Sequence, residues 1–320
     1  MAWDTFYRGT GEPHDTTLPD APPWRVFPRS SAPRTFKPPK GLTDAVNAAV
    51  FLHRPLLITG AAGSGKSTVI EQVADELRLG PVLRWHITSR STLPDALYRY
   101  DALGHIQSLR LAQSGAPVKA VDDIAAFLQL GPLGTALLPD TTRPRALLID
   151  EIDKSDLDLP SDLLDVLERG VYEIPELVRH SRSRVSVRRW RGDGEDTTTE
   201  LPPYEVQEGR VQCQRFPFIV MTSNGEREFP APFLRRCIRY DMPRLSVELL
   251  REAVEAHVEQ SLPPHAAELV QEFVERVARG ETLAVDQLLN AVKLVIDDHG
   301  PTGEQRDRLI GYLLRNLSGA

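Results

Sequence analysis

The sequence is poor in the features that mark secreted and membrane proteins. It contains only two cysteines, Cys213 and Cys237, which are too few for a disulfide framework. No run of about 18 apolar residues occurs, which argues against a transmembrane helix. The opening segment, MAWDTFYRGTGEPHD, lacks both the basic n-region and the apolar h-region of a secretory signal. These absences predict a cytoplasmic, reduced protein with no membrane partner.

The 320 residues carry a formal net charge of −7, with 41% hydrophobic and 26% charged residues. This composition is ordinary for a globular protein of one or two domains. The negative balance argues against bulk binding to nucleic acid. However, residues 245–320 alone contain 7 basic and 13 acidic residues, so almost the whole excess belongs to that region. The balance therefore says little about the rest of the chain.

Three regions differ in their patterns. Residues 1–40 are rich in proline and show no periodicity, which predicts an extended arm or a partly disordered tail, with Trp24, Val26 and Phe27 as candidate anchors. Residues 41–244 alternate strand-like and helical patterns, which predicts an α/β fold with a parallel sheet. Residues 245–320 show only helical patterns and predict an all-helical domain. Strands are expected near 56–58, 82–88, 146–150, 217–222 and 237–241, and helices near 43–53, 66–79, 246–260, 264–279, 283–297 and 303–316.

The strongest motif is a glycine-rich loop between an apolar strand and an amphipathic helix, with the pattern G-x-x-x-x-G-K-[ST] at residues 60–67. Its backbone N–H groups and the helix N-terminus form a cradle for phosphates. Lys66 can reach the β- and γ-phosphates, and Ser67 can bind Mg²⁺. The alternative is a chance glycine-rich turn. The expected ATP-binding residues are Gly60, Ala61, Ala62, Gly63, Ser64, Gly65, Lys66, Ser67 and Thr68.

Two further strand ends carry candidate catalytic groups. Asp150 and Glu151 follow an apolar strand, where Asp150 can hold Mg²⁺ and Glu151 can act as general base on the attacking water. An acidic pair that caps a helix is the alternative. Asn224 follows the strand at 218–222 and can hold that water opposite Glu151, although asparagine at such a place is more often a turn former.

Two arginines, Arg235 and Arg236, stand directly before the last expected strand. Either can serve as an arginine finger that stabilises the γ-phosphate charge at the site of a neighbouring subunit. The alternative is a surface pair that forms salt bridges with acidic side chains.

Together, these motifs resemble those of AAA+ ATPases of the MoxR branch. The resemblance rests on GAAGSGKS at 60–67, LLIDEID at 147–153, TSN at 222–224 and FLRR at 233–236, and it covers residues 41–320. It implies a P-loop core with a parallel five-stranded sheet at 41–244, a helical lid at 245–320, and a ring, usually a hexamer, that binds ATP and Mg²⁺ at subunit boundaries. It also implies a chaperone-like motor that remodels a protein substrate, with a von Willebrand A domain protein as partner.

One feature departs from the family pattern. Many AAA+ lids carry an arginine at the start of their third helix, but Leu283–Asn290 contains none, and Lys293 is the nearest basic residue. The departure is compatible with weak turnover.

The core also contains an unusual insertion at about 179–212. Six arginines are followed by six acidic residues across a Gly192-Asp193-Gly194 turn. We expect a hairpin whose basic and acidic strands neutralise one another, and a basic finger for nucleic acid is the alternative. Elsewhere, Tyr98 and Tyr100 are candidates to grip a polymer, but tyrosines at this spacing are more often core residues. His86 is expected to cap or pack.

Three functions remain open at this point. The first is an active remodelling ATPase, and the second is a nucleotide-gated scaffold with weak turnover. The third, less favoured, is a nucleic-acid translocase of a phage-defence or restriction-like system that uses the arginine-rich hairpin.

Overall fold

The computed structural model describes residues 6–7, 9–16, 18, 20–22, 25, 36–113, 124–195, 198, 200–243, 246–258, 261–281, 283–297 and 300–316. The candidate anchors Trp24, Val26 and Phe27 lie outside the described residues.

The chain divides into two compact units. The sheet unit contains Pro38–Gly60 and Lys66–Met242. The helical unit contains Met1–Lys37, Ala61–Gly65 and Pro243–Ala320. The glycine-rich loop at 61–65 therefore groups with the C-terminal helices, whereas the residues on either side of it belong to the sheet unit.

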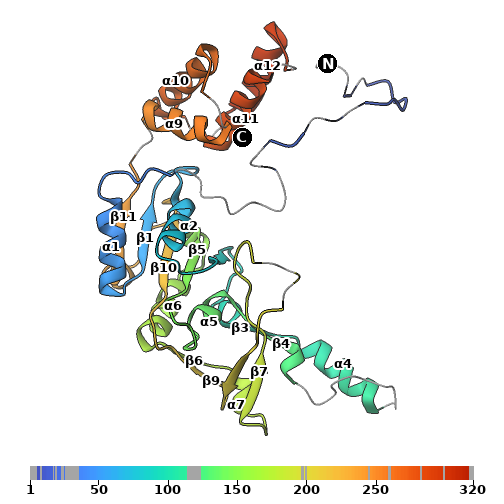
Figure 1. The fold of residues 1–320 in the computed structure, drawn as a ribbon, viewed down its shortest axis with the longest axis vertical. Helices are drawn as coiled ribbons and strands as arrows, with labels where there is room; N and C mark the ends of the chain where they lie inside the picture. The colour runs from blue at the N-terminus through green and yellow to red at the C-terminus, as the bar shows by residue number, and fades with distance from the viewer. Residues whose placement is uncertain are drawn as a thin grey trace. The chain divides into compact units, whose positions relative to one another are not determined.

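The sheet unit is built on five parallel strands in the order β11-β1-β10-β5-β2 (Figure 1). The three central strands are almost entirely buried, which explains their continuous apolar sequences, because helices cover both faces of a parallel sheet. The predicted five-stranded parallel sheet is confirmed. Its strands are β1 (Leu56–Thr59), β2 (Leu83–His86), β5 (Ala146–Asp150), β10 (Phe218–Ser223) and β11 (Ile238–Asp241).

Six of the described helices of this unit pack around its hydrophobic core, against the sheet or against one another, and α6 illustrates the pattern. Its leucines at 159, 163, 164 and 167 recur at helical spacing and are all buried, while its polar residues face outward. The helix ends at Gly170, whose φ of 60° lies in the left-handed region that glycine tolerates. The six helices are α1 (Leu42–Leu52), α2 (Lys66–Glu76), α3 (Leu93–Leu97), α5 (Pro132–Ala136), α6 (Leu159–Arg169) and α8 (Ala231–Leu234).

A two-stranded sheet that the sequence patterns did not predict joins β3 (Tyr98–Tyr100) to β4 (Leu128–Leu130). Between these strands the chain contains α4 (Ala102–Gln113) and the 3-10 helix η3 (Ile124–Phe127). The tyrosines at both ends of β3 are half-buried and pack against the main hydrophobic core. The structure thus gives them the core role that was the alternative to gripping a polymer.

Three strands of the arginine-rich insertion join a preceding strand, β6, in a four-stranded antiparallel sheet with the order β6-β9-β8-β7. The strands are β6 (Val171–Glu173), β7 (Arg184–Val187), β8 (Tyr204–Gln207) and β9 (Arg210–Gln212), with the short helix α7 (Pro175–Val178) after β6. The predicted pairing of a basic with an acidic strand is confirmed for β7 and β8, where Arg184 and Glu205 form an ion pair of 3.5 Å.

We also expected the basic and acidic residues of the insertion to neutralise one another. For most of the segment after β7 this prediction was wrong. Arg189 pairs with Asp140 rather than with an acidic residue of the insertion. Nε of Arg84, on β2, lies 2.7 Å from Oδ2 of Asp193. The reason is that residues 188–195 fold back onto the body of the sheet unit, which supplies their partners.

The helical unit contains the four predicted helices, which surround their own hydrophobic core. Leu250, Phe273, Leu288 and Val292 are buried there. The helices are α9 (Val247–Val258), α10 (Pro264–Ala278), α11 (Val285–Ile296) and α12 (Gly303–Leu313). The prediction of a helical C-terminal region is confirmed.

Candidate functional site

Three adjacent strands bring the predicted residues of the sheet unit to one edge. Gly60 follows β1, Asp150 ends β5 with Glu151 directly after it, and Asn224 follows β10. The carboxyl ends of parallel strands meet at the same edge, where open α/β sheets bind their ligands. Because β10 lies between β1 and β5, Asn224 lies between the glycine and the acidic pair.

Lys66 is the first residue of α2 and is buried at this edge. Its Nζ donates hydrogen bonds to the carbonyl oxygen of Gly60 and to Oδ1 of Asn224, both at 2.8 Å. Burial lowers the pKa of the Lys66 ammonium group, and the nearby carboxylates of Asp153 and Asp150 counteract that shift. A buried ammonium donor of this kind suits phosphate oxygens.

Asp150 is held by neighbouring hydroxyl groups. Ser67 Oγ donates to Asp150 Oδ1 at 3.0 Å, and Thr222 Oγ1 donates to the same oxygen at 2.6 Å. Nη1 of Arg84 lies 3.8 Å from the other oxygen, Oδ2. The Ser67 hydroxyl and the Asp150 carboxylate therefore form an adjacent pair of hard oxygen ligands, which is the type that Mg²⁺ prefers.

Glu151 has an unusual backbone conformation for a residue with a side chain. Its φ of 60° and ψ of 48° lie in the left-handed region, which turns the chain sharply as it leaves β5. Its backbone N–H donates to Thr222 Oγ1 at 2.9 Å. Non-glycine residues in this region cost roughly 1–3 kcal/mol and concentrate at functional sites. Thr222 thus fixes both acidic residues, because its hydroxyl bonds to the side chain of Asp150 and to the backbone N–H of Glu151.

Each oxygen of the Glu151 carboxylate has a partner. Asn224 Nδ2 donates to Oε1 at 3.3 Å, and Lys154 Nζ donates to Oε2 at 2.8 Å. The imidazole Nε2 of His86, at the end of β2, is 3.6 Å from Oε2. The Asn224 amide therefore bridges Lys66 and Glu151, which are two of the predicted site residues.

Asp153 positions the loop that carries Asn224. It is 3% exposed, and its Oδ2 accepts hydrogen bonds from the backbone N–H groups of Asn224 and Glu226, at 2.9 and 3.1 Å. This contact fixes the backbone from which the Asn224 amide projects.

In the helical unit, the loop of Ala61–Gly65 lies against α11. A Cβ atom at Gly63 would be 3.0 Å from Cβ of Val285, and one at Gly65 would be 3.1 Å from the ring of Phe36. Both glycines also have positive φ, of 75° and 83°, so a side chain would be strained at either position. Lys293, the basic residue nearest to the start of α11, forms an ion pair with Asp297 at 3.2 Å.

The two candidate arginine fingers differ in their surroundings. Arg236 forms an ion pair with Glu168 of α6, and its Nη1 also donates to the carbonyl of Pro232 at 3.2 Å. Arg235 is exposed, and its own carbonyl accepts a hydrogen bond from Arg54 at 2.8 Å. No ion pair joins the Arg235 side chain to an acidic residue of the described chain. Arg236 thus matches the salt-bridged alternative, and Arg235 matches the accessible candidate.

Sequence reasoning assigned no role to three residues that contact the predicted site, Thr222, Asp153 and Lys154, and expected His86, which also contacts it, only to cap or pack. The first three lie inside or next to the motifs, so their proximity was a usable signal. His86 joins the site because β2 pairs with β5, and the sequence does not specify that neighbour.

The family model of the AAA domain, dynein-related subfamily, matches residues 55–225. These residues make up more than half of the chain. The chain belongs to this AAA domain family. The match includes the glycine-rich loop, the acidic pair and Asn224, while Arg235, Arg236 and the C-terminal helices lie beyond it.

No curated protein matches the sequence of this AAA domain protein. Among solved structures it is similar to NtrX from Brucella abortus, with 14% identity and a TM-score of 0.46 over 89% of this chain and 55% of that one. It is also similar to a point mutant of RuvB from Thermotoga maritima, with 15% identity and a TM-score of 0.39 over 86% of this chain and 75% of that one. The chain thus spans about half the length of NtrX. None of the helices in the described ranges has the length and hydropathy that a membrane span requires.

Proposed function

We propose that this AAA domain protein is an ATP-hydrolysing ring motor of MoxR type that remodels a protein partner. The observation that carries the proposal is the Asn224 amide, which contacts both the buried Lys66 ammonium and the Glu151 carboxylate. A group that binds phosphate and a group that activates water must be adjacent for hydrolysis, and one side chain joins them here.

In this proposal the sheet edge binds and orients ATP, through Gly60–Thr68. Lys66 donates to phosphate oxygens, and Asn224 orients the attacking water. Glu151 accepts the proton that the water loses. Arg235, Arg236 or both act on the nucleotide of a neighbouring copy, and the isolation of Arg235 makes it the stronger candidate.

The residues present are compatible with Mg²⁺, because the Ser67 hydroxyl and the Asp150 carboxylate lie 3.0 Å apart and are both hard oxygen ligands. When bound, the ion neutralises charge on the phosphates. The chain itself orients Asp150 through Thr222, at 2.6 Å, so that one carboxylate oxygen is fixed before any ion binds.

The remaining parts of the proposal rest on the sequence: the arm and the location on its composition, and the other parts on the resemblance. They are a Pro-rich arm at 1–40, a nucleotide-binding domain at 41–244 and a lid at 245–320. They also include a hexameric ring, a cytoplasmic location and a partner with a von Willebrand A domain.

The decisive test replaces the general base. Glu151→Gln is expected to retain ATP binding and to lower phosphate release by roughly 10²-fold or more. Lys66→Ala is expected to lose ATP binding itself. Glu205→Gln, the same exchange at an exposed residue of β8, is the matched control and should leave turnover unchanged. Normal turnover in Glu151→Gln would refute the assignment of the base.

A second function, a nucleotide-gated scaffold, is favoured by one specific observation. Both oxygens of the Glu151 carboxylate are occupied by Asn224 and Lys154, which limits its capacity to accept a proton. A steady-state assay decides between the two functions, because robust hydrolysis that disappears in Lys66→Ala excludes the scaffold.

A further inference from the structure

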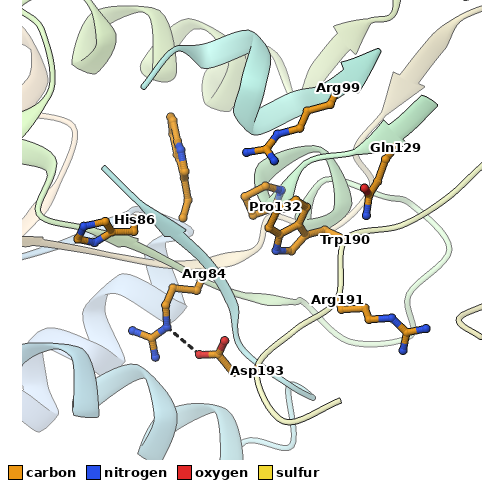
Figure 2. A pocket seen from close by; sticks show the side chains of 9 residues that line it. Arg84, His86, Arg99, Gln129, Pro132, Trp190, Arg191 and Asp193 are labelled. Atoms are coloured by element: carbon orange, nitrogen blue, oxygen red, sulfur yellow. Dashed lines mark hydrogen bonds and ion pairs between the residues drawn. The ribbon is translucent and has the colours of Figure 1, made fainter. Parts of the chain in front are cut away.

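The sheet unit contains a pocket of about 520 Å³ beside β2, and its walls are rich in guanidinium and indole groups (Figure 2). It lies between the main sheet, the β3–β4 pair and the segment that follows β7. The lining includes Arg84, His86, Arg99, Trp190, Arg191 and Asp193. The lining thus contains three guanidinium groups and one carboxylate, and Arg84 has two further acidic partners outside the lining, Glu71 and Asp150. Pockets of this size commonly hold small organic ligands.

The wall that carries Trp190 is anchored on both sides. The Trp190 backbone N–H donates to the buried Oγ1 of Thr135 at 2.9 Å, and the Asp193 N–H donates to the Val82 carbonyl at 2.8 Å. Gly192 lies between these two residues in the chain, and a Cβ atom added there would be only 2.7 Å from Cβ of Pro81. The insertion therefore packs directly on the body of the unit, and its anchored backbone forms a pre-organised wall.

Arg99 is the cation best placed to meet a ligand. Its guanidinium carbon lies 5.1 Å from the centre of the Trp190 ring, so the indole face stabilises its charge and restricts its position. The side chain is exposed, and it forms no ion pair with the acidic groups of the described residues. Figure 2 shows it extending into the pocket opposite Arg84. Its N–H edge is thus available for a bidentate acceptor.

Arg84 differs, because three carboxylates already neutralise it. It contacts Asp193 at 2.7 Å, Glu71 at 3.0 Å and Asp150 at 3.8 Å. These contacts hold the floor of the pocket and account for the one carboxylate in the lining. Arg99, by contrast, lies over the Trp190 ring and has no acidic partner among the described residues.

We propose that this pocket binds a phosphate group attached to an aromatic base, as in a single-stranded nucleic acid or a free nucleotide. The planar fork of the exposed Arg99 guanidinium matches the geometry of a phosphate group. The guanidinium plane of Arg99, held over the indole of Trp190, provides a surface on which a base can stack. The inference does not depend on ATP hydrolysis, since the pocket lining contains none of the phosphate-binding loop residues.

The test measures binding of a fluorescein-labelled oligothymidylate to the full chain by anisotropy at low salt. The Lys66→Ala background removes binding at the glycine-rich loop. In that background, Arg99→Ala is expected to weaken binding about tenfold, the loss of one charged hydrogen-bonding group. It should also reduce the salt dependence by about one unit of slope. Arg99→Lys keeps the charge without the planar fork and should fall in between.

Arg210→Ala is the matched control, because Arg210 is an exposed arginine of the same insertion whose partner is Glu173 at 3.1 Å. It should bind like the background protein, and thermal melts check that every variant is folded. Calorimetry with AMP separates the two sources of phosphate, since AMP binding without oligonucleotide binding identifies a free nucleotide as the ligand. The proposal is overturned if neither probe binds, if Arg99→Ala equals Arg210→Ala, or if a polyglutamate peptide binds as tightly through Arg99.

Discussion

The ammonium nitrogen of Lys154 lies 2.8 Å from Oε2 of Glu151, three residues earlier in the chain. The hydrogen bond to Glu151 is the main reason that the pKa of Lys154 is raised above its ordinary value. The same contact occupies Oε2, so a water molecule must compete with the Lys154 ammonium group for that oxygen. If Glu151 is the general base, Lys154 restrains turnover.

Replacing Lys154 with Met is therefore expected to increase basal ATP turnover roughly two- to fivefold, the range that corresponds to the energy of a partly exposed ion pair. The measurement is steady-state phosphate release at saturating ATP. Lys293→Met is the matched control, because Lys293 also pairs with a nearby acidic residue of the next turn, Asp297, but belongs to the helical unit. Lower turnover in Lys154→Met would show that the ion pair assists rather than restrains the reaction.

The two neighbouring arginines are expected to separate in function. Arg235→Ala should keep ATP binding and lower turnover by about 10³-fold, as expected for the loss of an arginine finger. Arg236→Ala should chiefly lower the melting temperature, because it breaks the ion pair with Glu168. The measurements are phosphate release and a thermal melt for each variant.

A mixing experiment tests whether Arg235 acts in trans. In a mixed assembly, an Arg235→Ala subunit supplies an intact Glu151, and a Glu151→Gln subunit supplies an intact Arg235. Recovery of turnover on mixing two inactive variants is the expected result. Mixtures that remain inactive would argue that Arg235 acts within its own subunit or has another role.

The core of the fold was predictable because its signals are local. Strands β5 and β10 are buried on both faces, and such strands have continuous apolar sequences. These apolar runs were therefore enough to indicate strands of a parallel sheet. The site residues on those strands also followed, since the ends of parallel strands share an edge. Asp150 and Asn224 could therefore be assigned to one place without knowledge of the strand order.

Features that depend on long-range packing were not predictable. His86 contacts Glu151 only because β2 is the neighbour of β5. Arg189 finds Asp140 because its segment folds back onto the sheet unit, whereas charge counting pairs it with acidic residues nearer in sequence. In both cases the partner is set by tertiary structure, which composition and periodicity do not encode.

The two cysteines are expected to differ in reactivity towards a thiol reagent. Burial raises the pKa of the Cys237 thiol to about 12 and also raises that of Cys213, which is only half-buried. Near pH 8, Cys213 should be labelled first, and Cys237 only after denaturation. Mass spectrometry of the labelled peptides measures the order. Rapid native labelling of Cys237 would contradict its burial.

The same shifts predict a loss of stability in alkali. An unfolded cysteine ionises near pH 8.5, while the folded thiols remain protonated to higher pH. These thiols therefore make their full contribution to stability below that pH. The contribution decreases as the pH rises towards the pKa values of the thiols in the folded protein. Urea melts from pH 7 to pH 10 should show a smaller alkaline loss in Cys237→Ala than in the parent, once both are compared with their own stability at pH 7.

Thr222→Val is expected to impair both stability and metal dependence. The hydroxyl is buried, donates to Asp150 at 2.6 Å and accepts the Glu151 N–H at 2.9 Å. Valine has nearly the same shape but leaves that N–H unsatisfied beside a strained backbone, which costs about 1–3 kcal/mol of unfolding free energy. It also releases the Asp150 carboxylate, so the Mg²⁺ concentration needed for half-maximal turnover should increase. Thr302→Val, at an exposed threonine of the helical unit, is the control. A variant that loses stability while its Mg²⁺ dependence stays unchanged would limit Thr222 to a structural role.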